Sequence, residues 1–238
     1  MTAIITDTLK KQLLLDIITD IDSAANDYYI GVGRSETWDG TDTAPTPKNS
    51  QRDTRNLGLS LQSVKAVADK SLVVPRTDWS SGATYSSWND NIEGHPVSAY
   101  YVFTDENHVY ICLQAGRNAS GNVVNSTVKP TGTSTNAFKA ADGYVWKFLF
   151  SIGALTASKF LSANFLPVTF ITETDSDSPA SIVEQKGIQD AAVPGEIVGY
   201  TVTAGGTGYT STPTATIVGN GGTLAKADVT VSGGAVSK

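Results

Sequence analysis

A run of aromatic residues at every second position constrains this chain more than any other feature. The run spans residues 142–152, and its alternation places one apolar set on one face of a strand: Tyr144, Trp146, Phe148, Phe150 and Ile152. Each buried aromatic side chain removes roughly 150–250 Å² from water, so several other elements must cover this face. The Asp-Gly pair at its start is typical of a turn. The run therefore predicts a core strand entered from a turn.

The composition favours β structure and argues against two kinds of partner. The chain has 238 residues, 40% hydrophobic and 17% charged, which is enough for one large β domain or two smaller ones. The formal charge is −6, and the 17 basic residues are nowhere clustered, so we expect no nucleic-acid partner. No apolar run approaches the roughly 20 residues of a membrane-spanning helix, and no signal peptide is recognisable. We expect a soluble protein that is made in the cytoplasm and does not insert into membranes.

The N-terminal segment carries an amphipathic helical pattern. Thr6 or Asp7 can cap a helix over residues 8–24, and its apolar stripe consists of Leu9, Leu13, Leu14, Ile17, Ile18 and Ile21. This stripe must dock either on a sheet of the same chain or on a partner. A second short helix is predicted over residues 57–70.

Short β-type runs in the middle of the chain predict an antiparallel sheet. Residues 99–103 and 109–113 flank a five-residue polar connection, which is a hairpin signal. Residues 73–79 and 166–171 are expected to be extended, and each contains a proline, which cannot donate to a ladder. In the first of these, Arg76 and Asp78 project to the same side and can pair. A brief helix is predicted within residues 156–165, between the aromatic run and the segment 166–171.

The chain changes character after the last of these strands. Residues 172–195 are acidic and Ser-rich at their start, which predicts a linker or surface loop. Residues 196–238 form a Gly- and Thr-rich β module, with strands expected at 197–202, 214–218, 225–231 and 235–236. We expect this module to be the start of a longer repeat array. The predicted organisation is a mainly β (α+β) domain over 1–171, sandwich-like or barrel-like with peripheral N-terminal helices, followed by the linker and the module.

The chain contains few of the side chains that catalysis and metal binding commonly use. There are two histidines, His95 and His108, and one cysteine, Cys112, with no metal-ligand spacing, so neither a hydrolase triad nor a zinc site is expected. Cys112 is expected to be a buried, inert thiol. We predict no catalytic residue, no cofactor and no metal, and hence no enzyme.

Two further hypotheses survive the composition. A glycosidase needs only two carboxylates, and no spacing favours one pair among Glu36, Asp39, Asp90, Glu93, Asp105 and Glu106. Aromatic residues in polar loops, such as Trp38, Trp79 and Trp88, would suit a carbohydrate-binding adhesin or a module associated with a tail fibre. The same aromatics also suit a protein core or a protein interface.

Four stretches, in this order, resemble the motifs of a known family. They are residues 33–38 (Gly-Arg-Ser-Glu-Thr-Trp), 73–79 (Val-Val-Pro-Arg-Thr-Asp-Trp), 109–113 (Val-Tyr-Ile-Cys-Leu) and 142–150 (Asp-Gly-Tyr-Val-Trp-Lys-Phe-Leu-Phe). The family is the baseplate wedge subunit of T-even-like contractile phage tails, the eighth gene product. The resemblance runs from about residue 9 to residue 167, and the Gly- and Thr-rich tail departs from it.

The resemblance implies a virion structural protein of the tail baseplate. Such a protein would connect neighbouring wedge proteins by protein–protein contacts and would form a homodimer, without catalysis. The residues that carry over do so as framework only: Gly33, Arg34, Trp38, Pro75, Arg76, Asp78, Trp79, Gly143, Tyr144 and Trp146.

Overall fold

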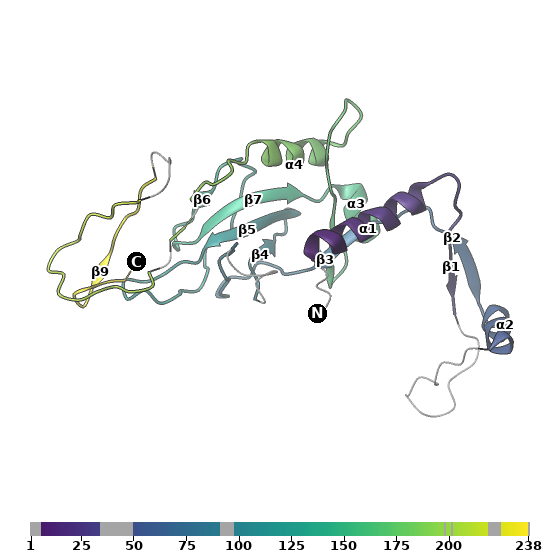
Figure 1. Cartoon of the computed structure of the whole chain (residues 1–238), viewed down its shortest axis with the longest axis horizontal. Helices are drawn as coiled ribbons and strands as arrows, with labels where there is room; N and C mark the ends of the chain where they lie inside the picture. Colours follow the sequence, from purple (N-terminus) through teal and green to yellow (C-terminus); the bar gives the residue numbers. More distant parts are fainter. Residues whose placement is uncertain are drawn as a thin grey trace. The chain divides into compact units, whose positions relative to one another are not determined.

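The computed structural model describes residues 6–33, 50–90, 98–197, 199–200, 202–218 and 225–237. The chain has a mixed α+β fold that is mainly β, and its sheets are antiparallel (Figure 1). It divides into two compact units, Met1–Lys70 (unit 1) and Ser71–Lys238 (unit 2). This division differs from the predicted boundaries at 171 and 196, because the segments on both sides of those positions belong to unit 2.

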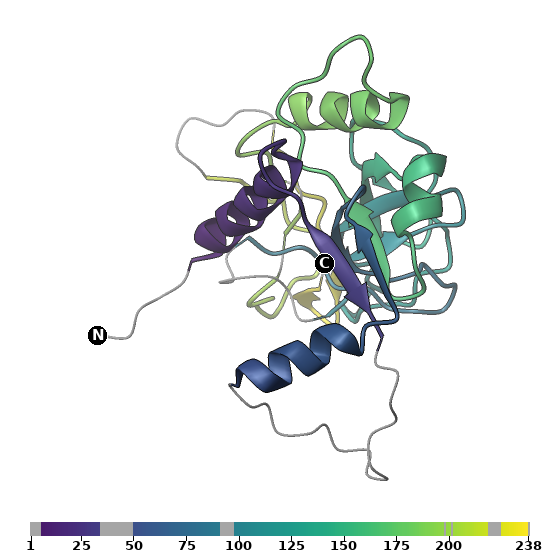
Figure 2. The same ribbon diagram turned by 90° about the vertical axis from the view of Figure 1, so that its right-hand side faces the viewer.

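Unit 1 contains two helices and one pair of strands among its described residues. They are α1 (Asp7–Asp22), β1 (Tyr29–Val32), α2 (Gln51–Leu59) and β2 (Ser63–Ala66), with β1 and β2 antiparallel. Helix α1 confirms the predicted N-terminal helix, and the Thr6 hydroxyl accepts a hydrogen bond from the Leu9 amide at 3.3 Å. The prediction of a helix over 57–70 was wrong, since α2 lies earlier and β2 occupies part of that range. The two helices lie at opposite ends of the strand pair (Figure 2).

Unit 1 has no core among the side chains that the structure describes. None of them is buried, and every residue of β1 and β2 is exposed. The stripe of α1 is also open, with Leu13 52% and Ile17 56% exposed. The apolar face of α1 is therefore not covered by a sheet of its own unit.

Unit 2 is built on a four-stranded antiparallel sheet with the order β4-β5-β7-β6. These strands are β4 (Tyr101–Phe103), β5 (His108–Gln114), β6 (Phe138–Lys139) and β7 (Val145–Ser151). The predicted hairpin is confirmed as β4 and β5, but its connection is shorter than expected because His108 begins β5. The sheet is open at β4 and β6, so the barrel-like alternative is not realised.

A second pair of strands in unit 2 confirms two predicted extended segments. Strand β3 (Leu72–Pro75) pairs antiparallel with β8 (Phe165–Val168). Pro75 is the last residue of β3, where its missing N–H costs the ladder little. Helix α3 (Ala154–Phe160) connects β7 to β8 and overlaps the predicted brief helix.

The aromatic run forms β7 and supplies the core, although in two parts. Tyr144, Trp146 and Phe148 are fully buried in one cluster with Tyr110. Tyr110 pairs with Phe148, and Val109 with Phe150, so one residue of β7 is skipped at a bulge. Beyond the bulge, Ile152 and Val109 belong to a second cluster. The predicted continuous apolar face is thus divided.

Helix α4 (Ala180–Asp190) lies within the predicted linker at 172–195. It lies along β7 (Figure 1), and its Ile188 is only 6% exposed, in the same cluster as Trp146. The Ser151 hydroxyl donates a hydrogen bond of 2.6 Å to Glu184 of α4. The linker prediction was wrong because a single buried isoleucine gives too short an apolar pattern to mark a helix.

The C-terminal segment contains less β structure than its pattern predicted. In its described residues the strands are β9 (Val231–Ser232) and β10 (Ala235–Val236), which form a small hairpin. The described residues of the strands expected at 197–202 and 214–218, and most of those at 225–231, have no regular secondary structure and lie outside any ladder. The C-terminal segment is joined to the rest of unit 2 by contacts such as the hydrogen bond that the Ser237 hydroxyl donates to the Ala119 carbonyl.

Candidate functional site

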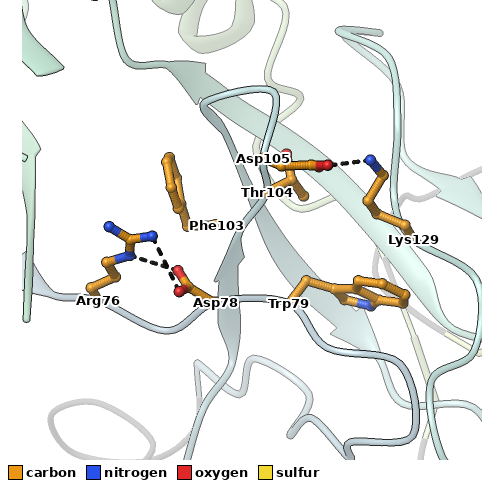
Figure 3. A pocket seen from close by; sticks show the side chains of 7 residues that line it. All are labelled: Arg76, Asp78, Trp79, Phe103, Thr104, Asp105 and Lys129. Carbon is orange, nitrogen blue, oxygen red and sulfur yellow. Dashed lines mark hydrogen bonds and ion pairs between the residues drawn. The ribbon is translucent and has the colours of Figure 1, made fainter. Parts of the chain in front are cut away.

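One cavity of unit 2 gathers residues from a motif that the sequence singled out (Figure 3). It has a volume of about 340 Å³ and lies where the segment after β3 meets the β4–β5 turn. The residues that line it are Arg76, Asp78, Trp79, Phe103, Thr104, Asp105 and Lys129. Three of them come from the predicted framework set, and the others come from β4, from the β4–β5 turn and from the loop before β6.

Arg76 is held by three different groups. Its Nε donates to Asp78 Oδ1 at 2.7 Å and its Nη2 to Asp78 Oδ2 at 3.2 Å, so the predicted pairing is confirmed as a two-pronged one (Figure 3). Its Nη1 donates to the Ser162 carbonyl at 3.0 Å, and its guanidinium carbon lies 4.8 Å from the centre of the Phe103 ring. Arg76 therefore ties the segment after β3 to β4 and to the turn before β8.

The backbone next to Arg76 extends the sheet. The Trp79 amide donates to the Phe103 carbonyl and the Phe103 amide to the Thr77 carbonyl, each at 2.8 Å, which makes a parallel bridge between Asp78 and Phe103. Trp79 Nε1 donates to the hydroxyl of Ser126 at 3.1 Å, and Ser126 is fully buried. The motif thus continues the sheet beyond β4 and anchors it to the loop around Ser126.

On the other side of the cavity, Lys129 binds the β4–β5 turn. Its Nζ lies 2.7 Å from Asp105 Oδ1 and 2.9 Å from Glu106 Oε1. The hydrogen bond with Lys129 lowers the pKa of Asp105, and the hydrogen bonds with Asp105 and Glu106 raise the pKa of Lys129. Asp105 and Lys129 are therefore both charged at neutral pH.

The charged groups of this cavity suit a structural role, in which they hold segments together, better than catalysis. A glycosidase needs one carboxyl group that stays protonated to act as the acid. Asp78 instead pairs with Arg76, and Asp105 is ionised beside Lys129. The cavity therefore holds two charged pairs, which fix neighbouring segments in place.

The remaining framework residues occupy two other places. Gly33 follows β1 at a φ of 112°, where an added Cβ would lie 2.7 Å from Cβ of Gln62. Gly143 has a φ of 89° in the turn before β7. Tyr144 stacks on Trp146 with ring centres 5.6 Å apart, and its hydroxyl donates to the Val124 carbonyl at 2.7 Å. Arg34 and Trp38 lie outside the described residues.

Asp142 is a structural residue whose role the sequence interpretation did not identify. Its carboxylate accepts hydrogen bonds from the amides of Thr127 (2.8 Å) and Val128 (2.9 Å), from the hydroxyl of Ser126 (3.1 Å) and from the amide of Tyr144 (3.2 Å). Burial opposes the charge, but the hydrogen bonds outweigh it and lower the pKa of Asp142. Asp142 ties the loop before β6 to the start of β7, and an Asp just before the turn glycine was the one signal for it.

The other candidate residues show no reactive arrangement. Cys112 is fully buried, and burial raises the pKa of its thiol to about 12. His108 lies at the start of β5, not at a hairpin tip, and its ring centre is 5.4 Å from that of Phe148. Trp88 lies beside Tyr100 with ring centres 5.1 Å apart and is not fully exposed. Asp90 is exposed, and the candidates His95, Glu36, Asp39 and Glu93 lie outside the described residues.

Two comparisons with known sequences find no match. No protein-family model matches the chain, and no curated protein sequence matches it. Among the described residues, no cluster of three or more histidine, cysteine or acidic side chains is placed to hold a metal ion. Within the same residues, no helix has the length and apolar character needed to cross a membrane.

Proposed function

We propose that this protein is a non-enzymatic structural component of the baseplate wedge of a contractile phage tail. In this role it connects neighbouring wedge proteins by protein–protein contacts, and it does so as a homodimer. The proposal rests on the four motifs that resemble the T-even wedge subunit. The observation that carries the contact function is the uncovered apolar surface of unit 1.

That surface carries apolar side chains that are each at least 40% exposed. Its exposed apolar side chains come from α1, from the strand pair and from α2: Leu9, Leu13, Leu14, Ile17, Tyr28, Tyr29, Ile30, Val32, Leu59 and Val64. Fully burying one such aliphatic side chain stabilises by about 1.5–3 kcal/mol, so covering several of them can hold a complex together. Exposed apolar surface of this kind marks a site where another protein binds.

Unit 2 supports the proposal as the rigid half. Arg76 links the segment after β3 to Phe103 of β4 and to the Ser162 carbonyl, and Lys129 links the loop before β6 to the β4–β5 turn. A rigid unit together with an exposed apolar surface on the other unit suits a protein that sets the angle between neighbouring subunits. Any movement on tail contraction would then be a rigid-body rotation about an interface.

The decisive test is to look for the chain in intact tails. Mass spectrometry and electron microscopy of purified tails from the phage that encodes this chain should find it in the baseplate, in contact with other wedge proteins. Its absence from the baseplate would overturn the proposal. Light scattering on the purified chain tests the homodimer separately.

A variant pair tests the surface itself. Replacing Leu13→Glu together with Ile17→Glu should abolish incorporation into the baseplate, because two charges then lie in the contact. The matched control is Leu155→Glu on α3, where the side chain is 71% exposed in unit 2. Equal incorporation of both variants would remove unit 1 from the mechanism.

A further inference from the structure

A second, larger cavity lies at the opposite end of the β4-β5-β7-β6 sheet from the cavity that Arg76 and Lys129 line. Its volume is about 970 Å³, and it is enclosed by the ends of β5 and β6 on one side and by the C-terminal segment on the other. Gln114 and Lys139 line it from the sheet, and Tyr200, Ile217 and Val229 line it from the C-terminal segment. All of these residues belong to unit 2, so this cavity is separate from the surface of unit 1.

Two backbone segments around this cavity make no backbone hydrogen bonds among the described residues. Residues 214–218 and 225–230 have no regular secondary structure, and each segment contains β-branched residues, among them Ile217 and Val229. Among the described residues, no backbone hydrogen bond involves 210–218 or 225–229. Both segments line the cavity, through Ala215, Thr216 and Ile217 on one side and Ala227, Asp228 and Val229 on the other. Backbone N–H and C=O groups without partners can bind an added strand by main-chain hydrogen bonds.

The charged groups of the lining favour an acidic ligand. Three basic residues, Arg117, Lys139 and Lys226, face one acidic residue, Asp228. This excess of positive charge occurs in a chain whose formal charge is −6. Lys139 and Lys226 are exposed, whereas Arg117 already donates to the Gly121 carbonyl at 2.6 Å. The two lysines are thus the groups that meet a ligand first.

We propose that this cavity binds an extended, acidic segment of a partner polypeptide, which adds to the C-terminal segment as a β-strand. Main-chain pairing along residues 214–218 or 225–229 provides the register, and Lys139 and Lys226 select acidic side chains. The proposal goes beyond the function above, because it concerns a different surface and a different kind of contact.

The lining favours a polypeptide over a nucleic acid. Single-stranded nucleic acids bind on several aromatic side chains that stack with successive bases. Among the described residues that line this cavity, Tyr200 is the only aromatic one. Unpaired backbone edges, in contrast, match the donors and acceptors of another peptide chain.

The test uses the full chain and defined probes in isothermal titration calorimetry. The first probe is an octapeptide that alternates threonine and glutamate, and the second alternates threonine and lysine. The third is the acidic octapeptide with every second amide N-methylated, which blocks strand pairing. The proposal expects the acidic peptide to bind at least tenfold more tightly than either other peptide, and its affinity to fall with added salt.

Variants locate the site. Lys139→Glu combined with Lys226→Glu should weaken binding of the acidic octapeptide at least tenfold. The control Lys159→Glu introduces an exposed negative charge on α3 and should change binding less than twofold. Circular dichroism shows whether the variants keep the fold of the parent chain.

Three results would overturn the proposal. Equal binding of the N-methylated peptide would mean that no strand is added, and failure of the acidic peptide to bind would remove the site. Tighter binding of a single-stranded oligothymidylate would assign the cavity to a polyanion of another class. Each of these results leaves the baseplate function intact, because that function is tested through unit 1.

Discussion

Helix α1 and strand β7 carry equally clear apolar patterns but differ completely in burial. Trp146 and Phe148 of β7 are fully buried, whereas Leu13 and Ile17 of α1 are about half exposed, at 52% and 56%. The difference lies in the surroundings, because β5 and α4 pack against β7 and no described side chain of unit 1 is buried. A periodic pattern therefore shows which face is apolar, and only the rest of the assembly shows what covers it.

The largest effect is expected in the core of unit 2. Phe148→Ala should lower the free energy of unfolding by about 3–5 kcal/mol, since it removes a fully buried ring beside Tyr110 and His108. Urea unfolding followed by tryptophan fluorescence measures the change. The control Phe165→Ala removes a ring that is 46% exposed and should cost clearly less. Equal losses would contradict the assignment of the core to β7.

Asp142 should give the next largest effect, because its removal leaves several amides without an acceptor. Asp142→Ala should destabilise unit 2 by on the order of 3 kcal/mol at neutral pH. The pKa of Asp142 is lowered in the folded chain, so its contribution is complete above the pKa of the unfolded chain and is lost as pH falls. The difference in stability between the parent and the variant should therefore begin to shrink below about pH 4 and continue to shrink as the pH falls through the lowered pKa of Asp142. A constant difference from pH 7 to pH 3 would exclude the charged form as the cause.

A smaller effect on stability is expected at the pair of Arg76 and Asp78. Arg76→Lys keeps the charge but loses the two-pronged geometry with Asp78 and the contact with Phe103, and should cost about 1 kcal/mol. A double-mutant cycle with Asp78→Asn isolates the pair by urea unfolding. A coupling energy near zero would mean that the packing on Phe103, not the ion pair, holds the segment after β3.

The smallest effect on stability is expected in unit 1. Leu13→Gln with Ile17→Gln should change the unfolding free energy of the purified chain by less than about 0.5 kcal/mol, because neither side chain is buried. The same variant should be lost from assembled baseplates. A large loss of stability in the isolated chain would show that the two regions are less different than their burial indicates.

Local chemistry allowed much of the fold to be predicted. The Asp-Gly turn, the alternation in β7, the hairpin of β4 and β5, and the cap at Thr6 all depend on residues close together in sequence. The pairing of Arg76 with Asp78 is of the same kind, since an extended backbone projects both side chains to one side. These predictions are confirmed because no distant contact is needed to decide them.

Other features depended on distant or weak signals. Lys129 is 24 residues from Asp105 in sequence, so nothing local indicated that they pair. Helix α2 is polar and lacks an apolar stripe that could mark it, and α4 buries only Ile188. In the C-terminal segment the alternating pattern predicted strands, but a strand also needs a neighbour, and its described residues form only the hairpin of β9 and β10. For the same reason no local pattern could reveal the larger cavity.

The burial of Cys112 gives this protein a built-in reporter of opening. It is the single cysteine of the chain, it is fully buried in β5, and its thiol has a pKa of about 12. A thiol reagent can therefore react only when β5 separates from its neighbours, so the labelling rate measures how often the sheet opens. Unit 1 contains no cysteine and does not contribute to that signal. One reagent can thus follow the opening of unit 2 in the purified chain, with no label added to the protein beforehand.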